Sequence, residues 1–191
     1  MKKFTLLCMI CLAFSGLLTA QVIEDFEGPK YWLRTWDVND KSSFTLVPNP
    51  DNTGINKSNS VLKFIRDKNG TTVAGFIGPV DPFYNDGTMY YHVKVWKPRI
   101  SPIWFGFYTY GFTGEPGNRP MNPQTVVHGW EELVFNVPTY STAHWLEFNP
   151  EDIVPEGLTE DVILYVDDIT MNHDPAVGST PEVVFADFDH I

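Results

Sequence analysis

The chain has 191 residues, of which 13 are Lys or Arg and 24 are Asp or Glu, so its formal net charge is −11. This length fits one ordinary domain, and the strong acidic balance disfavours nucleic-acid binding because phosphate groups would be repelled. The only two cysteines are Cys8 and Cys11, near the amino end. The rest of the chain therefore offers no disulfide, no thiol nucleophile and no cysteine ligand for a metal.

The first twenty residues have the composition of a secretory signal peptide. Two lysines are followed by an apolar run over Phe4–Leu18, and the small residue Ala20 precedes Gln21. The run is too short and too close to the N-terminus for a membrane-spanning helix. We therefore expect residues 1–20 to be cleaved and the protein to be secreted, without membrane insertion, to the periplasm, the medium or the cell surface. Cleavage would leave 11 basic and 24 acidic residues, a formal charge of −13.

Beyond this segment, short runs rich in Val, Ile, Phe, Tyr and Trp alternate with clusters of turn residues, and no stretch shows helical spacing over three turns. This pattern predicts an all-β fold, an antiparallel β-sandwich. The expected strands are Val22–Phe26, Phe44–Val47, Val61–Arg66, Val73–Ile77, Met89–Trp96, Ile103–Tyr110, Glu131–Val137 and Val162–Met171.

The expected strands Met89–Trp96 and Ile103–Tyr110 carry the aromatic residues of most functional interest. Alternation places Tyr90, His92, Lys94 and Trp96 on one face of the first, and Trp104, Gly106, Tyr108 and Tyr110 on one face of the second. If both sets share the outer face of one sheet, they form an aromatic platform on which sugar rings can stack, with polar groups for the hydroxyls. Alternatively, both faces of these strands are buried. The candidate carbohydrate-binding residues are Trp104, Tyr108, Tyr110, His92, Trp96 and, after the first strand, Trp36.

The remaining segments suggest a long loop and a tandem arrangement. Gly111–Gln124 is rich in Pro and Gly and is expected to be a rim or a lid. Residues 173–181 have the composition of a linker that follows a module over residues 21–172. Val184–Asp189 then repeats Val22–Glu27 at an offset of 162 residues with three identities. The repeat indicates that residues 182–191 begin a second, truncated copy, although a C-terminal strand of the same sheet is the alternative.

Three segments together carry a family resemblance. They are Val22–Gly28, Asn49–Lys63, and Gly129–Phe135 followed by Tyr165–Ile169. In this order they resemble secreted bacterial jelly-roll modules of the carbohydrate-binding, galactose-binding-like type, over Val22–Met171. The resemblance implies a jelly-roll fold and a glycan or polysaccharide as the partner.

The same resemblance implies a structural calcium ion that ties the first strand to the last. Its expected ligands here are Glu27 and Asp168, and carboxylate oxygens suit calcium. The alternative is that these acids form turns or pair with lysines at the edge of the sheet.

Sequence signals of an enzyme are weak. The chain has no Gly-x-Ser-x-Gly, His-Glu-x-x-His or Glu-x-Asp-x-x-Glu motif. The acid pairs Glu131-Glu132 and Asp167-Asp168 are adjacent on strands, so their side chains should point to opposite faces. We therefore predict a non-catalytic carbohydrate-binding module. The alternatives are a structural or adhesive spacer that packs on a neighbouring module of a longer cell-surface protein, and a jelly-roll glycosidase or lyase.

Overall fold

A computed structural model of the chain describes residues 21–27, 41–70, 74–109, 117–138, 140–152 and 158–179. The predicted signal peptide and second copy, together with Trp36 and Tyr110, lie outside these residues. No helix that could span a membrane occurs in the described part of the chain. Its strands are β1 (Gln21–Glu24), β2 (Ser43–Pro48), β3 (Ser60–Arg66), β4 (Ala74–Asp86), β5 (Tyr90–Trp96), β6 (Trp104–Tyr108), β7 (Trp130–Asn136), β8 (Tyr140–Glu151) and β9 (Val162–Asn172).

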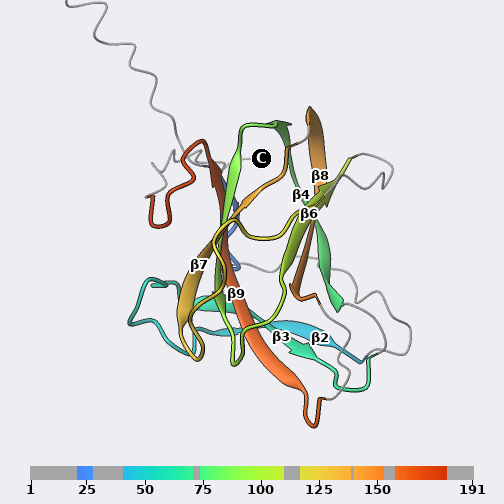
Figure 1. Cartoon of the computed structure of the whole chain (residues 1–191), viewed down its shortest axis with the longest axis vertical. Helices are drawn as coiled ribbons and strands as arrows, with labels where there is room; N and C mark the ends of the chain where they lie inside the picture. Colours follow the sequence, from blue (N-terminus) through green and yellow to red (C-terminus); the bar gives the residue numbers. More distant parts are fainter. Residues whose placement is uncertain are drawn as a thin grey trace, which may run out of the picture.

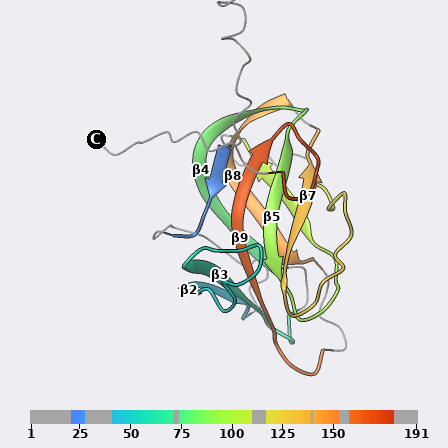
Figure 2. The same ribbon diagram turned by 90° about the vertical axis from the view of Figure 1, so that its left-hand side faces the viewer.

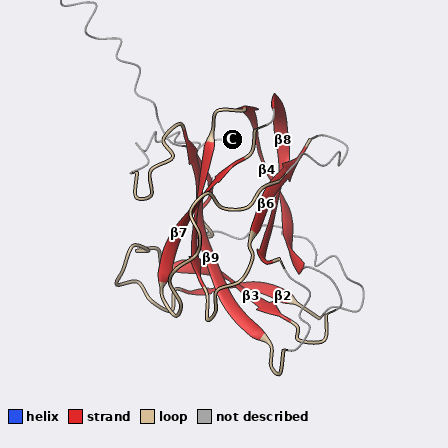
Figure 3. Cartoon of the chain, in the orientation of Figure 1, coloured by secondary structure: helices blue, strands red, loops and turns tan. Residues whose placement is uncertain are grey.

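The strands form two antiparallel sheets that pack face to face, which confirms the predicted β-sandwich (Figures 1 and 3). The large sheet has the order β2-β3-β9-β5-β7, and β1 also pairs with β9. The small sheet has the order β4-β8-β6. The long strand β9 pairs on one edge with β5, and on the other with β3 over its first half and with β1 over its second half (Figure 2). The first and last strands of the module are therefore neighbours.

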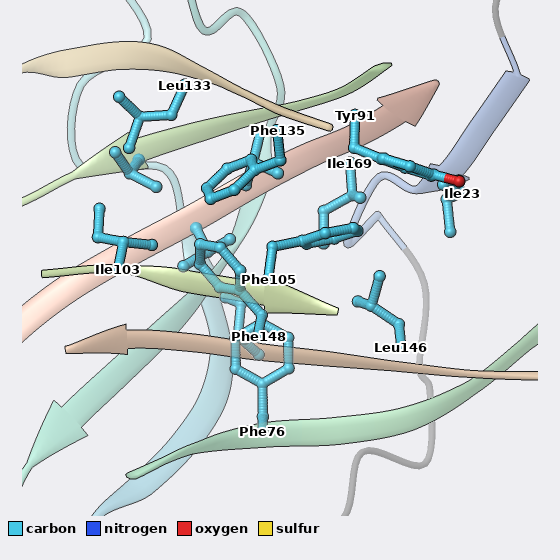
Figure 4. Close-up of a cluster of buried hydrophobic side chains, with 14 of the residues drawn as sticks. Ile23, Phe76, Tyr91, Ile103, Phe105, Leu133, Phe135, Leu146, Phe148 and Ile169 are labelled. Carbon is cyan, nitrogen blue, oxygen red and sulfur yellow. The ribbon is translucent and has the colours of Figure 1, made fainter. Parts of the chain in front are cut away.

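Between the sheets lies an aromatic core (Figure 4). The alternation predicted for β5 is confirmed, because Tyr91 and the two valines that follow on its face are buried there. Phe105, Phe135 and Phe148 come from β6, β7 and β8, and their ring centroids are 5.4 to 6.3 Å apart. Edge-on and tilted ring contacts of this kind add to the free energy gained from burying apolar area. This core fixes which side chains of each strand point outward.

The expectation that the aromatic faces of β5 and β6 share one sheet is wrong. β5 lies in the large sheet between β9 and β7, whereas β6 pairs with β8 at the edge of the small sheet. Alternation determines which side of a strand faces the core, but it carries no information about which sheet the strand joins. The predicted platform is therefore divided between the two opposite outer faces of the sandwich.

Two strands also differ from the expected boundaries. β8 was not expected, because its buried residues change phase between Ala143 and Leu146, where its pairing with β4 is also irregular, and this leaves only a short stretch of alternation. β4 continues beyond the expected Ile77 through two prolines, which an edge strand tolerates because the missing N–H groups can face outward. The long strands β4 and β8 form most of the small sheet.

Candidate functional site

The outer face of the small sheet gathers three aromatic and two polar side chains. Because Phe105 and Phe107 enter the core, Trp104 and Tyr108 of β6 point outward. On β8, Leu146 and Phe148 point into the core in the same way. Trp145, Glu147 and Asn149, which alternate with them, therefore point outward. The strand register pairs Trp104 with Asn149, Gly106 with Glu147 and Tyr108 with Trp145. We call Trp104, Tyr108, Trp145, Glu147 and Asn149 the small-sheet face.

Two glycines fix the position of the Trp104 indole. A Cβ atom at Gly106 would lie 2.4 Å from Cη2 of Trp104, and one at Gly117 would lie 1.9 Å from its Cζ2. Gly117 precedes Asn118, whose backbone exchanges hydrogen bonds of 2.8 and 3.1 Å with Phe105. The indole therefore lies flat against glycine backbone while remaining half-exposed. Only glycine permits so close an approach at these two positions.

The polar centre of this face is a carboxylate beside an amide. Asn149 Nδ2 donates a hydrogen bond of 3.1 Å to Glu147 Oε1, and both side chains are at least 95% buried. Burial raises the pKa of Tyr108, and its hydrogen bond to Glu147 and the charge of Glu147 raise it further. The phenol therefore stays protonated and donates to the carboxylate. This arrangement holds the Glu147 carboxylate in one orientation between aromatic rings.

His92 has a structural environment on the opposite face of the molecule. Its Nδ1 lies 2.7 Å from Glu132 Oε1, and its Nε2 lies 3.1 Å from Asn172 Oδ1 and 3.0 Å from the Asp174 carbonyl oxygen. The Gly178 N–H also donates to Glu132. Burial opposes protonation of His92, but the hydrogen bond and charge of Glu132 outweigh it and raise the His92 pKa. His92 thus holds the turn after β9 against the large sheet and is not presented to a ligand.

Trp96, also on the outer face of the large sheet, is half-exposed. Its ring meets Tyr165 edge to face at a centroid distance of 5.4 Å and His128 at 5.6 Å. It is separated from Trp104 by the thickness of the sandwich. Of the predicted binding residues, only Trp104 and Tyr108 are therefore brought together in the described residues.

The two predicted calcium ligands each have a partner within the protein. Glu27 Oε1 accepts hydrogen bonds of 2.7 and 3.0 Å from the N–H groups of Asn59 and Ser60. Asp168 Oδ2 lies 2.5 Å from Lys94 Nζ, as in the alternative of a lysine pair. No group of three or more His, Cys, Asp or Glu side chains that could hold a metal occurs among the described residues. Asp168 is thus paired with a lysine in the described structure, and its role as a calcium ligand stays a prediction.

Its neighbour Asp167 fits that role better. Asp167 lies where the edge of β9 passes from β3 to β1, and it is fully buried. Its Oδ2 accepts a 2.6 Å hydrogen bond from Asn56 Nδ2 and another from Ser58 Oγ, whereas its Oδ1 has no hydrogen-bond partner in the described structure. Burial raises the pKa of Asp167 to about 7. A buried, unpaired carboxylate oxygen is costly, and a cation would relieve that cost.

Sequence reasoning missed Trp145, Glu147 and Asn149 because β8 was not expected. The signal was present: Leu146 and Phe148 alternate with these three residues, the period-2 pattern of a strand with one buried face. Asp167 was missed because the family resemblance assigns the calcium ligand to the second acid of the Asp-Asp pair, which is Asp168. The backbone departs from regular β geometry there, with φ of 43° at Asp168 and a register shift opposite, between His92 and Lys94.

The fold is that of carbohydrate-binding modules with a β-sandwich. A family 11 carbohydrate-binding module from Clostridium thermocellum, in complex with a β-1,3-1,4-mixed-linked tetrasaccharide, has a TM-score of 0.57 at 11% identity, over 81% of this chain and 96% of that chain. The CBM22-1–CBM22-2 tandem domain from Paenibacillus barcinonensis Xyn10C has a TM-score of 0.55 at 16% identity, over 85% of this chain and 51% of that chain.

A third similar structure comprises the CBM22-1 and GH10 modules of Clostridium thermocellum xylanase 10B complexed with xylohexaose. It has a TM-score of 0.51 at 14% identity, over 80% of this chain and 28% of that chain. No protein-family model matches the sequence, and no curated protein matches it. The structural likeness confirms the predicted jelly-roll fold, and in two of these structures the matching part is one section of a longer chain.

Proposed function

We propose that this protein is a non-catalytic carbohydrate-binding module whose main glycan site is the small-sheet face. The observation that carries the proposal is the β6–β8 register, which surrounds the buried Glu147–Asn149 pair with Trp104, Tyr108 and Trp145. Two proteins of the same fold are described as complexes with oligosaccharides, one with a mixed-linked tetrasaccharide and the other with xylohexaose. A β-linked polysaccharide is the ligand class that this likeness favours.

The chemistry of binding follows from the two kinds of side chain on this face. Sugar rings present patches of C–H groups that pack on the indoles of Trp104 and Trp145, and their hydroxyls need fixed partners. The buried Glu147 carboxylate accepts from Tyr108 and Asn149, so it holds the partly exposed Tyr108 phenol oxygen in place as an acceptor for a sugar hydroxyl. Because this oxygen is already oriented, little conformational entropy is lost when the sugar binds.

The absence of catalytic activity is part of the proposal. Glycoside hydrolysis requires two carboxyl groups about 5 to 10 Å apart across the scissile bond. The other acid of β8 is Glu151, which is fully buried and forms ion pairs with Lys97 and Arg99. It is therefore unable to act as the acid or base that would complement Glu147. Secretion, as indicated by residues 1–20, would place the module where polysaccharides occur.

We also carry forward the proposal of a structural calcium ion, now with Asp167 in place of Asp168. Glu27 binds the backbone of Asn59 and Ser60, and Ser58 binds Asp167, so one short segment contacts both acids. The ion would tie this segment to β9. Addition of 1 mM CaCl2 should then raise the melting temperature, EGTA should reverse the rise, and Asp167→Asn should abolish it; equal melting temperatures with calcium and EGTA would refute the site.

The direct test of the main proposal is binding to a panel of soluble polysaccharides, followed by isothermal titration calorimetry with the best ligand. Trp145→Ala and Glu147→Gln should each weaken binding at least tenfold. Tyr140→Ala is the matched control, since Tyr140 is 76% exposed at the far end of β8. Circular dichroism melts separate this outcome from the spacer alternative, in which Trp145→Ala would destabilise the fold and no glycan would bind.

A further inference from the structure

A cavity lies on the large-sheet side of the sandwich, opposite the small-sheet face, where β5 ends and β9 begins. Its volume is about 600 Å³, within the roughly 300–1,000 Å³ typical of small-ligand sites. Trp96, Ile163 and Tyr165 line it from the outer face of the large sheet, and Arg99 and residues 158–162 line its rim. It includes none of the residues of the small-sheet face. In Figure 1 the start of β9, whose first residues line the cavity, is the lower end of that strand.

The aromatic wall of this cavity does not belong to the hydrophobic core. The strand register aligns Tyr165, Trp96 and Trp130 across β9, β5 and β7, and Lys63 of β3 continues the row beside Tyr165. None of the three aromatic residues is a member of the buried cluster between the sheets. Trp96 and Tyr165 are half-exposed and meet edge to face, which leaves ring surface facing the cavity.

The polar rim is held in place on both sides. Arg99 Nε donates a 2.8 Å hydrogen bond to Glu151 Oε1, and Glu151 is itself anchored by Lys97 Nζ at 3.1 Å. Across the cavity, the Lys68 N–H donates to Asp161 Oδ1 at 3.0 Å, and Lys68 Nζ donates to the Thr159 carbonyl oxygen at 3.2 Å. These contacts hold the guanidinium and the acidic segment at fixed positions before any ligand arrives. Preorganised polar groups of this kind favour binding.

The chemistry of the lining selects the class of ligand. An aromatic wall suits an apolar ring face, the carboxylates of Glu160 and Asp161 accept hydrogen bonds from hydroxyls, and Arg99 donates them. The net charge of −11 disfavours anionic ligands. We propose that this cavity is a second binding site, which takes a neutral sugar residue of a glycan. One module could then hold two glycan segments on opposite faces, and avidity would raise its apparent affinity for a polysaccharide.

This site can be tested separately from the small-sheet face by NMR. The full chain, ¹⁵N-labelled on tryptophan indoles, is titrated to 10 mM with a mixed-linked glucan tetrasaccharide, xylohexaose, cellohexaose and laminarihexaose. Saturable shifts of the Trp96 indole signal are expected with at least one of these oligosaccharides. Glu160→Gln should weaken that response about tenfold, with the Trp104 and Trp145 signals still responding to their own ligand.

Two matched variants decide the outcome. Trp145→Ala should leave the Trp96 response unchanged, which distinguishes failure of the second site from failure of the main proposal. Glu160 is exposed, so Glu160→Gln should leave the fold intact and report on this cavity alone. A Trp96 signal that no oligosaccharide shifts up to 10 mM, or one that responds identically in Glu160→Gln and wild type, would overturn the proposal.

Discussion

The two outer faces of the sandwich use aromatic residues in different ways. On the small sheet, Trp104 and Trp145 stand beside a buried carboxylate–amide pair in the middle of the strands. On the large sheet, Trp96 and Tyr165 form an edge-to-face corner at the strand ends, with charged groups only at the rim. The other end of that face, at His92, is covered by the turn after β9. The comparison shows that an outward-pointing aromatic residue becomes a candidate site only where the fold leaves it uncovered.

Removal of the shared core should destroy both faces and has the largest expected effect. Phe148 is fully buried and contacts Phe105 of the neighbouring strand and Phe135 across the sandwich. Phe148→Ala should lower the free energy of unfolding by about 3–5 kcal/mol, measured by urea denaturation. A loss below about 1 kcal/mol would mean that the sheets do not depend on this contact.

Ionisation of Asp167 should lower the stability of the protein through the large sheet alone. Its folded-state pKa of about 7 exceeds the ordinary value of 3.8, so the folded protein binds more protons between these pH values than the unfolded chain does. Stability should therefore fall as pH rises from about 4 to about 7, by roughly 2–4 kcal/mol in the absence of calcium. The free energy of unfolding of wild type, taken relative to Asp167→Asn, should show this slope. Asp168→Asn is the control, and an equal slope in both variants would contradict the assignment.

Gly117 offers a way to perturb only the small-sheet face. Gly117→Ala would place a methyl group against the Trp104 indole and displace it, since the Cβ would lie 1.9 Å from a ring atom. We expect about tenfold weaker glycan binding and a loss of about 1–2 kcal/mol in stability, with the Trp96 response unchanged. Gly54→Ala is the matched control because no atom lies within 4 Å of its Cβ position. Unchanged affinity in Gly117→Ala would argue against Trp104 as a binding residue.

The smallest expected effect is the loss of stability on deprotonation of His92, at the covered end of the large sheet. Because the folded-state pKa of His92 is raised, its contribution to stability is fully present below about pH 6.5 and is lost as pH rises through that folded-state value. Exchange of the Gly178 amide hydrogen, whose N–H binds Glu132, should therefore accelerate at alkaline pH beyond the intrinsic rate. His92→Gln should remove this dependence, and His173→Gln should retain it.

The sequence was sufficient to predict local alternation and the fold class, and it failed where the fold depends on long-range pairing. Phe105 and Phe107 face the core as the pattern of β6 indicates. That β5 and β6 join different sheets follows from hydrogen bonds between strands far apart in the chain, which alternation does not encode. Alternation also could not predict the burial of Asp167, because this residue is buried at the point where the strand paired with β9 changes from β3 to β1.

Two of the five residues of the proposed glycan site followed from the sequence. Trp104 and Tyr108 were identified from one strand, whereas Trp145, Glu147 and Asn149 required knowledge of β8 and its register. A polar residue such as Glu147 looks like any surface acid in the sequence, and only its burial beside Tyr108 distinguishes it. The chemistry of the face therefore depends on a pairing between strands that are separated by more than thirty residues.

The most direct test of the central claim is calorimetric titration of wild type, Trp145→Ala and Glu147→Gln with the polysaccharide that binds best in the panel. The proposed function predicts saturable binding by wild type, loss of binding in Trp145→Ala and at least tenfold weaker binding in Glu147→Gln, with melting temperatures close to that of wild type. Equal affinities in all three proteins, or a folded wild type that binds no polysaccharide, would contradict it.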